Sequence, residues 1–133
     1  MNTATTQSLA LQLLKPTFAI HSLAANSAIP SEALSAPIFF LAKTHGEVSI
    51  VLPEDIAIES EDVERDWRAL EVVGPLDFSL TGILSRISSI LANENISIFA
   101  ISTFDTDYIL VKQNNIDNAI DALSANQYKI TRD

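Results

Sequence analysis

The sequence predicts an α+β protein. Residues 67–133 show the order strand, helix, strand, strand, helix, strand, whereas residues 1–66 are rich in short apolar segments without a long amphipathic helix. The chain has 133 residues, of which 47% are hydrophobic, so it can bury a core. The βαββαβ order is that of a ferredoxin-like, or split βαβ, unit. We therefore expect two small ferredoxin-like modules, the first degenerate and strand-rich.

The first strand and helix of the second half follow from the spacing of apolar residues. Ala69–Val73 alternates as a half-buried strand does, and Gly74-Pro75 ends it. The helix is predicted over residues 79–93, with Asp77 or Ser79 as its N-cap. Its apolar residues recur every three or four positions, namely Leu80, Ile83, Leu84, Ile87, Ile90 and Leu91.

The remaining elements of the second half follow in order. Residues 96–102 are apolar and rich in isoleucine, which predicts a strand, and residues 107–111 predict its partner after a turn at 103–106. Asn114 or Asn115 is expected to cap a second helix, with apolar residues from Ile116 to Leu123. Residues 127–131 predict a short last strand.

The first half is less regular. Strands are predicted at 9–14 and, beyond Pro16, at 18–23, and one helical turn is predicted from Ser31. Residues 38–42 and 48–52 are expected to form a hairpin around residues 44–46. Identity between the two halves is too low to establish a repeat from sequence alone.

Charge and cysteine content restrict the functional classes. Eight basic against 17 acidic residues give a net charge of −9, which disfavours nucleic acid and anionic membrane surfaces as partners. The absence of cysteine excludes disulfides and thiolate sites, and fits a cytoplasmic protein. His21 and His45 form no zinc-binding spacing, and three glycines cannot build a phosphate or dinucleotide loop, so we expect no metal and no cofactor.

Much of the acidic excess lies in residues 54–66, where seven acidic residues are offset by Arg65 alone. Such a run repels itself and favours water, so it is expected to be a solvated connector or a short exposed helix. A docking surface for a basic partner is the alternative. Trp67, which follows, is expected to anchor this connector to the core.

Two motifs carry a family resemblance. The stretch from Trp67 to Val111, above all Gly74–Gly82 (GPLDFSLTG) and Ile101–Tyr108 (ISTFDTDY), resembles the small bacterial ACT-domain proteins, which are related to the cytosolic arginine sensors. Residues 47–54 resemble the first half of the same family. The resemblance implies an ACT-like module at 1–66, degenerate and ending in the connector 54–66, and an ACT module at 67–133. It also implies amino-acid binding at a module or subunit interface, without catalysis.

The same motifs supply candidate ligand-binding residues. Asp77 can accept from a ligand ammonium group, and Ser79 or Thr81 can donate to its carboxylate near a helix N-terminus. Gly82 would allow a close backbone approach. Asp105 and Asp107 suit an ammonium or guanidinium group. The full set is Pro75, Leu76, Asp77, Phe78, Ser79, Thr81, Gly82, Thr103, Asp105, Thr106 and Asp107.

Structural explanations remain open for each motif. Asp77 or Ser79 can act only as an N-cap, Gly82 only as a packing contact, and the 103–107 segment only as an Asx turn.

Three functions are compatible with the sequence. The first is an amino-acid sensor or regulator, expected as a homodimer or internal pseudo-dimer because the edge strands of such a sheet invite pairing. The second is a protein–protein interaction module with a vestigial ligand site. The third is a hydrolase or isomerase using Asp105 and Asp107, although no accompanying base or oxyanion donor can be named.

Overall fold

The computed structural model describes residues 9–73 and 82–132. The chain divides into two compact units: a larger unit takes the chain up to Lys15 and everything from Arg68 onward, and a smaller unit takes Pro16–Trp67. Residues 9–15 therefore group with the second half of the sequence and not with residues 16–66. The two functional modules at 1–66 and 67–133 stay a prediction.

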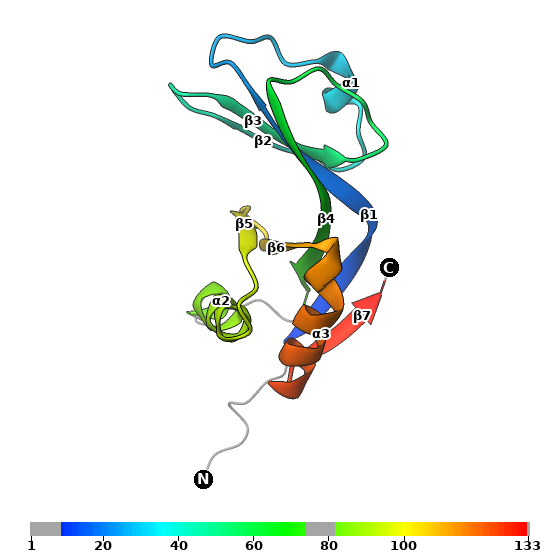
Figure 1. The fold of residues 1–133 in the computed structure, drawn as a ribbon, viewed down its shortest axis with the longest axis vertical. Helices are drawn as coiled ribbons and strands as arrows, with labels where there is room; N and C mark the ends of the chain where they lie inside the picture. The colour runs from blue at the N-terminus through cyan, green and yellow to red at the C-terminus, as the bar shows by residue number, and fades with distance from the viewer. Residues whose placement is uncertain (1–8, 74–81, 133) are drawn as a thin grey trace. The chain divides into compact units, whose positions relative to one another are not determined.

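The larger unit confirms the predicted βαββαβ order and the α+β class (Figure 1). Its elements run β4 (Asp62–Val72), α2 (Ile83–Asn93), β5 (Ile98–Ser102), β6 (Asp107–Lys112), α3 (Ile116–Ala125) and β7 (Lys129–Arg132). A single 3-10 turn, η2 (Gln113–Asn115), precedes α3. The first part of β1 (Ala10–Leu23) adds a further strand to this unit.

The strand order of the larger unit is β7-β1-β4-β6-β5. The last strand pairs with β1 in parallel, with Ala10 opposite Lys129 and Leu13 opposite Arg132. The N-terminal strand is thus inserted between β4 and β7, which the order of elements along the chain did not predict.

The core of the larger unit lies between α2, α3 and alternate side chains of its strands. Ile87 and Leu91 of α2 and Leu123 of α3 are fully buried, and they belong to one cluster with Leu11 and Leu70. Because the apolar residues of both helices recur at helical spacing, one face of each can enter this core. The predicted apolar periodicity of both helices is confirmed.

The smaller unit contains the rest of β1, the start of β4, α1 (Ser31–Leu34) and the hairpin of β2 (Phe40–Lys43) with β3 (Val48–Pro53). The predicted helical turn and hairpin are confirmed, with Phe40 opposite Val51 and Lys43 opposite Val48. In the hairpin turn the Thr44 N–H donates to the Glu47 carbonyl at 2.9 Å. His45 is exposed in this turn, as expected.

Two predictions for the first half were wrong. The strands predicted at 9–14 and 18–23 are one strand, β1, which continues through Pro16. Residues 62–66, predicted as connector or helix, are the exposed start of β4. Pairing with β1 explains the second difference, because the Glu61 N–H donates to the Ser22 carbonyl at 3.0 Å just before β4 begins. Trp67 ends this exposed stretch and is only 7% exposed, as an anchoring residue should be.

Candidate functional site

The turn between β5 and β6 brings four predicted site residues together. The Thr103 N–H donates to the Thr106 carbonyl at 2.8 Å, and the Thr103 hydroxyl oxygen accepts from the N–H groups of Asp105 and Thr106, both at 3.2 Å. The Ser102 hydroxyl donates to Asp107 Oδ1 at 2.6 Å. A threonine rather than an aspartate therefore closes the turn, and the Asx-turn explanation does not account for Asp105.

Thr106 joins this turn to the end of β4. Its hydroxyl donates to the Val72 carbonyl at 2.5 Å, and the next N–H, that of Val73, donates to the Ala10 carbonyl at 2.9 Å. The hydroxyl of Thr106 is thus already engaged with backbone. Thr106 holds the turn beside the residues that lead into the GPLDFSLTG motif.

Glu71 and Tyr108, which meet across β4 and β6, were not among the residues expected at the site. The Tyr108 phenol donates to Glu71 Oε2 at 3.4 Å. Burial raises the pKa of Tyr108 above its ordinary value, and the negative charges of Glu71 and Asp105 raise this pKa further. Both carboxylates therefore lie close enough to act on the phenol. Glu71 was detectable as the single charged residue within the apolar segment Ala69–Val73.

The candidate site is rich in carboxylates. Glu71, Asp105 and Asp107 contribute three carboxylates, and residues 100–111 contain no lysine or arginine. No hydrogen bond holds the Asp105 carboxylate within the described part of the chain. An exposed carboxylate next to a second one across the sheet is suited to an ammonium or guanidinium group.

Gly82 is the one residue of the GPLDFSLTG motif, Gly74–Gly82, that the structure describes. It is the N-cap of α2 with a φ of 77°, and a Cβ built there meets no atom within 4 Å. Glycine is therefore favoured by the left-handed backbone and not by the close approach expected from the sequence. The helix starts at Ile83, later than the expected residue 79, and Gly82 is its N-cap without a side-chain cap. The capping roles expected of Asp77 and Ser79 fall on residues outside the described part of the chain. Pro75, Leu76, Asp77, Phe78, Ser79 and Thr81 lie outside the described residues.

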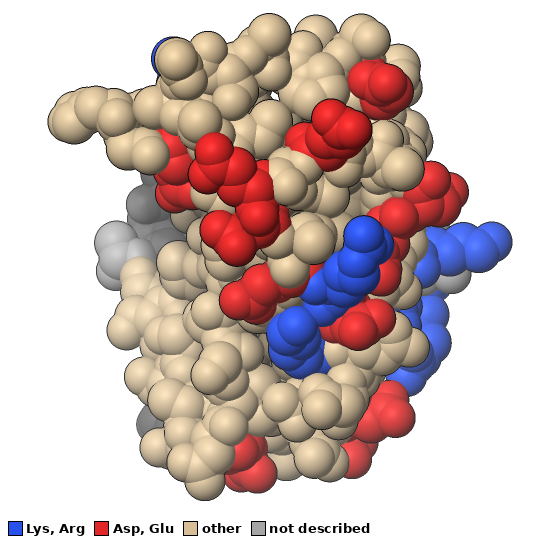
Figure 2. All heavy atoms as spheres, turned by 45° about the horizontal axis from the view of Figure 1, so that its top comes forward, with Lys and Arg blue, Asp and Glu red and all other residues tan. Residues whose placement is uncertain are grey.

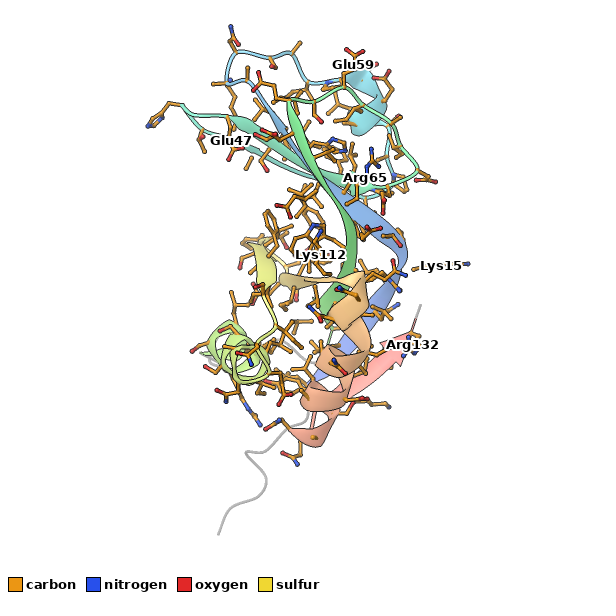
Figure 3. The ribbon with its side chains drawn as sticks, viewed as in Figure 1. Lys15, Glu47, Glu59, Arg65, Lys112 and Arg132 are labelled. Carbon is orange, nitrogen blue, oxygen red and sulfur yellow. The ribbon has the colours of Figure 1, made fainter. Side chains whose placement is uncertain are left out.

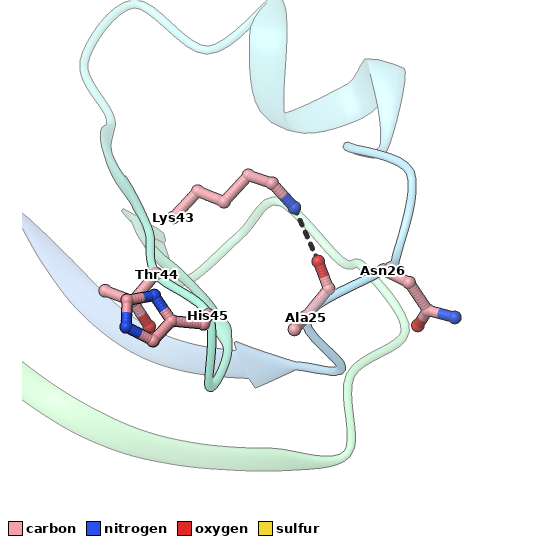
Figure 4. A pocket seen from close by; sticks show the side chains of 5 residues that line it. All are labelled: Ala25, Asn26, Lys43, Thr44 and His45. Atoms are coloured by element: carbon pink, nitrogen blue, oxygen red, sulfur yellow. Dashed lines mark hydrogen bonds between the residues drawn. The ribbon is translucent and has the colours of Figure 1, made fainter.

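The smaller unit has a shallow pocket of about 550 Å³ near its hairpin (Figure 4). Its lining consists of Ala25, Asn26, Lys43, Thr44 and His45. The Lys43 ammonium donates to the Ala25 carbonyl at 2.5 Å, and the Thr44 hydroxyl oxygen accepts from the N–H of Gly46 at 3.1 Å. These polar groups stabilise the hairpin and its neighbouring loop, and none of the predicted site residues lies here.

His21 is the buried polar residue of the smaller unit. It is 3% exposed, and its Nδ1 lies 2.9 Å from the Ser60 hydroxyl. Burial lowers the pKa of His21, and the charge of Arg65, labelled in Figure 3, lowers this pKa further. Within residues 9–73 and 82–132 no group of three or more His, Asp or Glu side chains is placed to hold a metal ion. The histidine is therefore best explained as a hydrogen-bonded core residue.

Comparison with known proteins places these features in a family. Residues 62–125 match a family model described as ACT domain. The chain is 32% identical to the human protein named cytosolic arginine sensor for mTORC1 subunit 1, and 33% identical to the mouse protein of that name. Each match covers 92% of this chain but 40% of the relative, so the chain spans less than half the length of these proteins.

Solved structures agree in fold. The crystal structure of protein Atu0741 from Agrobacterium tumefaciens is 30% identical, with a TM-score of 0.88 over 96% of this chain and 95% of that one. The regulatory subunit of aspartate kinase from Thermus thermophilus has a TM-score of 0.61 over 90% of this chain at 11% identity, which shows the fold alone. None of the helices in the described residues is long and apolar enough to cross a membrane.

Proposed function

The chain belongs to the ACT domain family and is related to the cytosolic arginine sensors, and from this we propose that it binds a free amino acid and acts as a regulatory or sensor protein without catalysis. The ligand site lies at the β5–β6 turn of the larger unit. The expectation that a second ACT module completes this site stays a prediction.

The negative charge beside Tyr108 is the observation from which we infer the class of ligand. Asp105 and Glu71 flank the phenol, and Asp107 follows on the same turn. Carboxylates bind cationic groups through charge-assisted hydrogen bonds, and an arginine guanidinium can take two of these at once. We infer that the ligand is an amino acid with a cationic side chain. Its own carboxylate and ammonium group would fall to Ser79, Thr81 and Asp77, whose placement is not described.

A thermal-shift screen of the twenty amino acids tests this function. A ligand present at a hundred times its dissociation constant should raise the free energy of unfolding by about 2.7 kcal/mol. We expect a cationic amino acid to raise the midpoint in the wild type and not in Asp77→Ala, whose far-UV dichroism should stay unchanged. An unfolded Asp77→Ala would instead favour a structural role for Asp77.

The alternative function is a protein interaction module with a vestigial ligand site. One observation favours it: Phe104, at the tip of the same turn, is 91% exposed. Contiguous exposed apolar patches mark interaction surfaces, and Phe104 would contribute one large side chain to such a patch. If no amino acid shifts the midpoint, this alternative gains support.

The same relatives also support a proposal for the location and the partners of the protein. These relatives are named as cytosolic sensors, so we propose that this chain acts in the cytoplasm, with no cofactor, nucleic acid or membrane among its partners. A homodimer is the proposed assembly. Acidic side chains outnumber basic ones on the face drawn in Figure 2, which agrees with the net charge of −9 and opposes binding to polyanions.

A further inference from the structure

Residues 54–61, which we call the strap, join β3 to β4 in the smaller unit. Their exposure alternates along the chain: the even-numbered residues are half-buried and the odd-numbered ones are exposed. This alternation is typical of an extended segment that lies with one side against the protein. On that side Ile56 and Ile58 pack against the apolar cluster that contains Ile50 and Leu52 of β3. The strap therefore covers part of the core of the smaller unit.

The strap is tied to β1 at both of its ends. The Glu54 N–H donates to the Thr17 carbonyl at 2.8 Å, and the Glu61 N–H donates to the Ser22 carbonyl at 3.0 Å. The second of these bonds is adjacent to Ser60, so a movement of Ser60 away from the core would break it.

Ser60 lies against a buried titratable group, the imidazole of His21. His21 Nδ1 and Ser60 Oγ are 2.9 Å apart, and His21 is 3% exposed. His21 is opposite Ile50 in the pairing of β1 with β3, and directly opposed side chains lie on the same face of a sheet. The imidazole therefore lies on the face that carries the core and the strap.

The charges near His21 disfavour its protonation while the strap is closed. Arg65, labelled in Figure 3, lies 3.8 Å from Glu54 through Nη1 and Oε1, and its positive charge acts on the imidazole. Neither β3 nor the rest of β1 within the smaller unit carries a charged residue. Four acidic residues of the strap and of the start of β4 are exposed to water, namely Asp55, Glu59, Glu61 and Asp62. A protonated imidazole would therefore gain both water and nearby carboxylates once the strap lifts.

We propose that the strap is a pH-dependent switch, closed over the core while His21 is neutral and opened between Ile56 and Glu61 when His21 takes up a proton. The Ser60 hydroxyl can donate to the neutral ring or accept from the protonated one, so it serves both forms. The protonated ring lacks water in the closed state, and a buried charge is costly without it. Lifting Ser60 admits water, whereas the apolar exposure of Ile58 that this requires keeps the strap closed at neutral pH. All of these groups belong to the smaller unit, so the proposal does not depend on amino-acid binding at the β5–β6 turn.

Native-state hydrogen exchange of the full chain, followed by NMR, tests the proposal on the Glu61 amide. The measurement runs between about pH 7 and about pH 5.5, above the range in which Asp and Glu ordinarily titrate. Because opening takes up one proton, we expect the protection of this amide to fall about tenfold for each pH unit below 6.5, down to the lowered pKa of His21. Low concentrations of urea should leave this exchange unchanged while they accelerate exchange in residues 48–52, because a local opening exposes little surface. Protection that is independent of pH, or a urea dependence equal to that of residues 48–52, would overturn the proposal.

His21→Gln is the variant for this experiment, and His45→Gln, at an exposed turn position of the same unit, is its matched control. We expect the pH dependence of Glu61 exchange to disappear in His21→Gln and to persist in the control. Ser60→Ala keeps the titrating ring but loses the hydroxyl contact, so it should lower the protection of Glu61 already at about pH 7. The same pH dependence in His21→Gln as in the wild type would assign the opening to another group and overturn the proposal. If His21→Gln does not fold, the pH and urea dependences of the wild type decide alone.

Discussion

Asp105 and Thr106 are adjacent in the sequence but have different roles. The Thr106 hydroxyl is used by the Val72 carbonyl, so its contribution to a ligand site is to hold the turn in place. Asp105 is exposed, and its charge reaches the half-buried phenol of Tyr108, whose pKa it helps to raise. A residue that acts on its neighbours through charge without a fixed hydrogen bond is available to a cationic ligand.

His21 gives a pH-dependent prediction. Its pKa in the folded protein is lowered, so the unfolded chain takes up a proton first as the pH falls below the ordinary value of 6.5. The stabilising contribution is complete above pH 6.5 and is lost as the pH falls through the lowered pKa. Urea unfolding should therefore show a falling free energy of unfolding over this range.

Two variants isolate that contribution. His21→Gln should reduce the pH dependence below 6.5, and His45→Gln, at an exposed turn position, should keep it. Equal slopes in His21→Gln and wild type would show that other groups cause the loss of stability.

At the scale of elements, the start of α2 depends on one backbone conformation. Gly82 has a φ of 77°, which costs a residue with a Cβ about 1–2 kcal/mol. We expect Gly82→Ala to lower the free energy of unfolding by about that amount. Gly46→Ala is the control, because the nearest atom to its added Cβ is Thr44 Oγ1 at an ordinary 3.8 Å. Chemical unfolding of both variants measures the difference, and equal stability of the two would contradict it.

Elements set by local spacing were predictable, and elements set by distant pairing were not. The apolar spacing of α2 and α3 and the turn of the β2–β3 hairpin are local properties, and the structure confirms them. The continuity of β1 through Pro16 and the early start of β4 depend on the partner strand, far away in the sequence. Glu71 was missed for the same reason, since its contact with Tyr108 joins positions 37 residues apart.

At the scale of the whole molecule, the N-terminal strand should be needed for the second half to fold. Leu11 and Leu13 of β1 are 0% and 2% exposed in the core of the larger unit, and β1 separates β4 from β7. A fragment of residues 67–133 would lose these side chains and its central pairing. We expect it to show no cooperative thermal unfolding, whereas the full chain does. A cooperatively folded fragment would show that residues 67–133 are a complete module.

Only part of the candidate site could be predicted from the sequence. The 103–107 turn was identified because its residue types and its family motif coincide, and the structure shows how Thr103 closes it. The role of Gly82 was misjudged, because sequence alone does not distinguish a positive φ from a close contact. Ligand binding by residues 75–79 and 81 stays a prediction, because these residues lie outside the described part of the chain.

The central claim is that Asp105 and its neighbouring carboxylates bind a cationic amino acid. Isothermal titration calorimetry of the full chain with L-arginine, L-lysine and L-glutamine tests it most directly, with Asp105→Asn as the variant and Asp121→Asn, exposed on α3, as its control. We expect a cationic amino acid to bind the wild type and Asp121→Asn equally well. Its affinity for Asp105→Asn should be lower by about tenfold or more, which corresponds to a loss of about 1.4 kcal/mol of binding free energy. Glutamine should give no comparable heat. Equal binding by Asp105→Asn, or no binding of either cationic amino acid to the wild type, would contradict the claim.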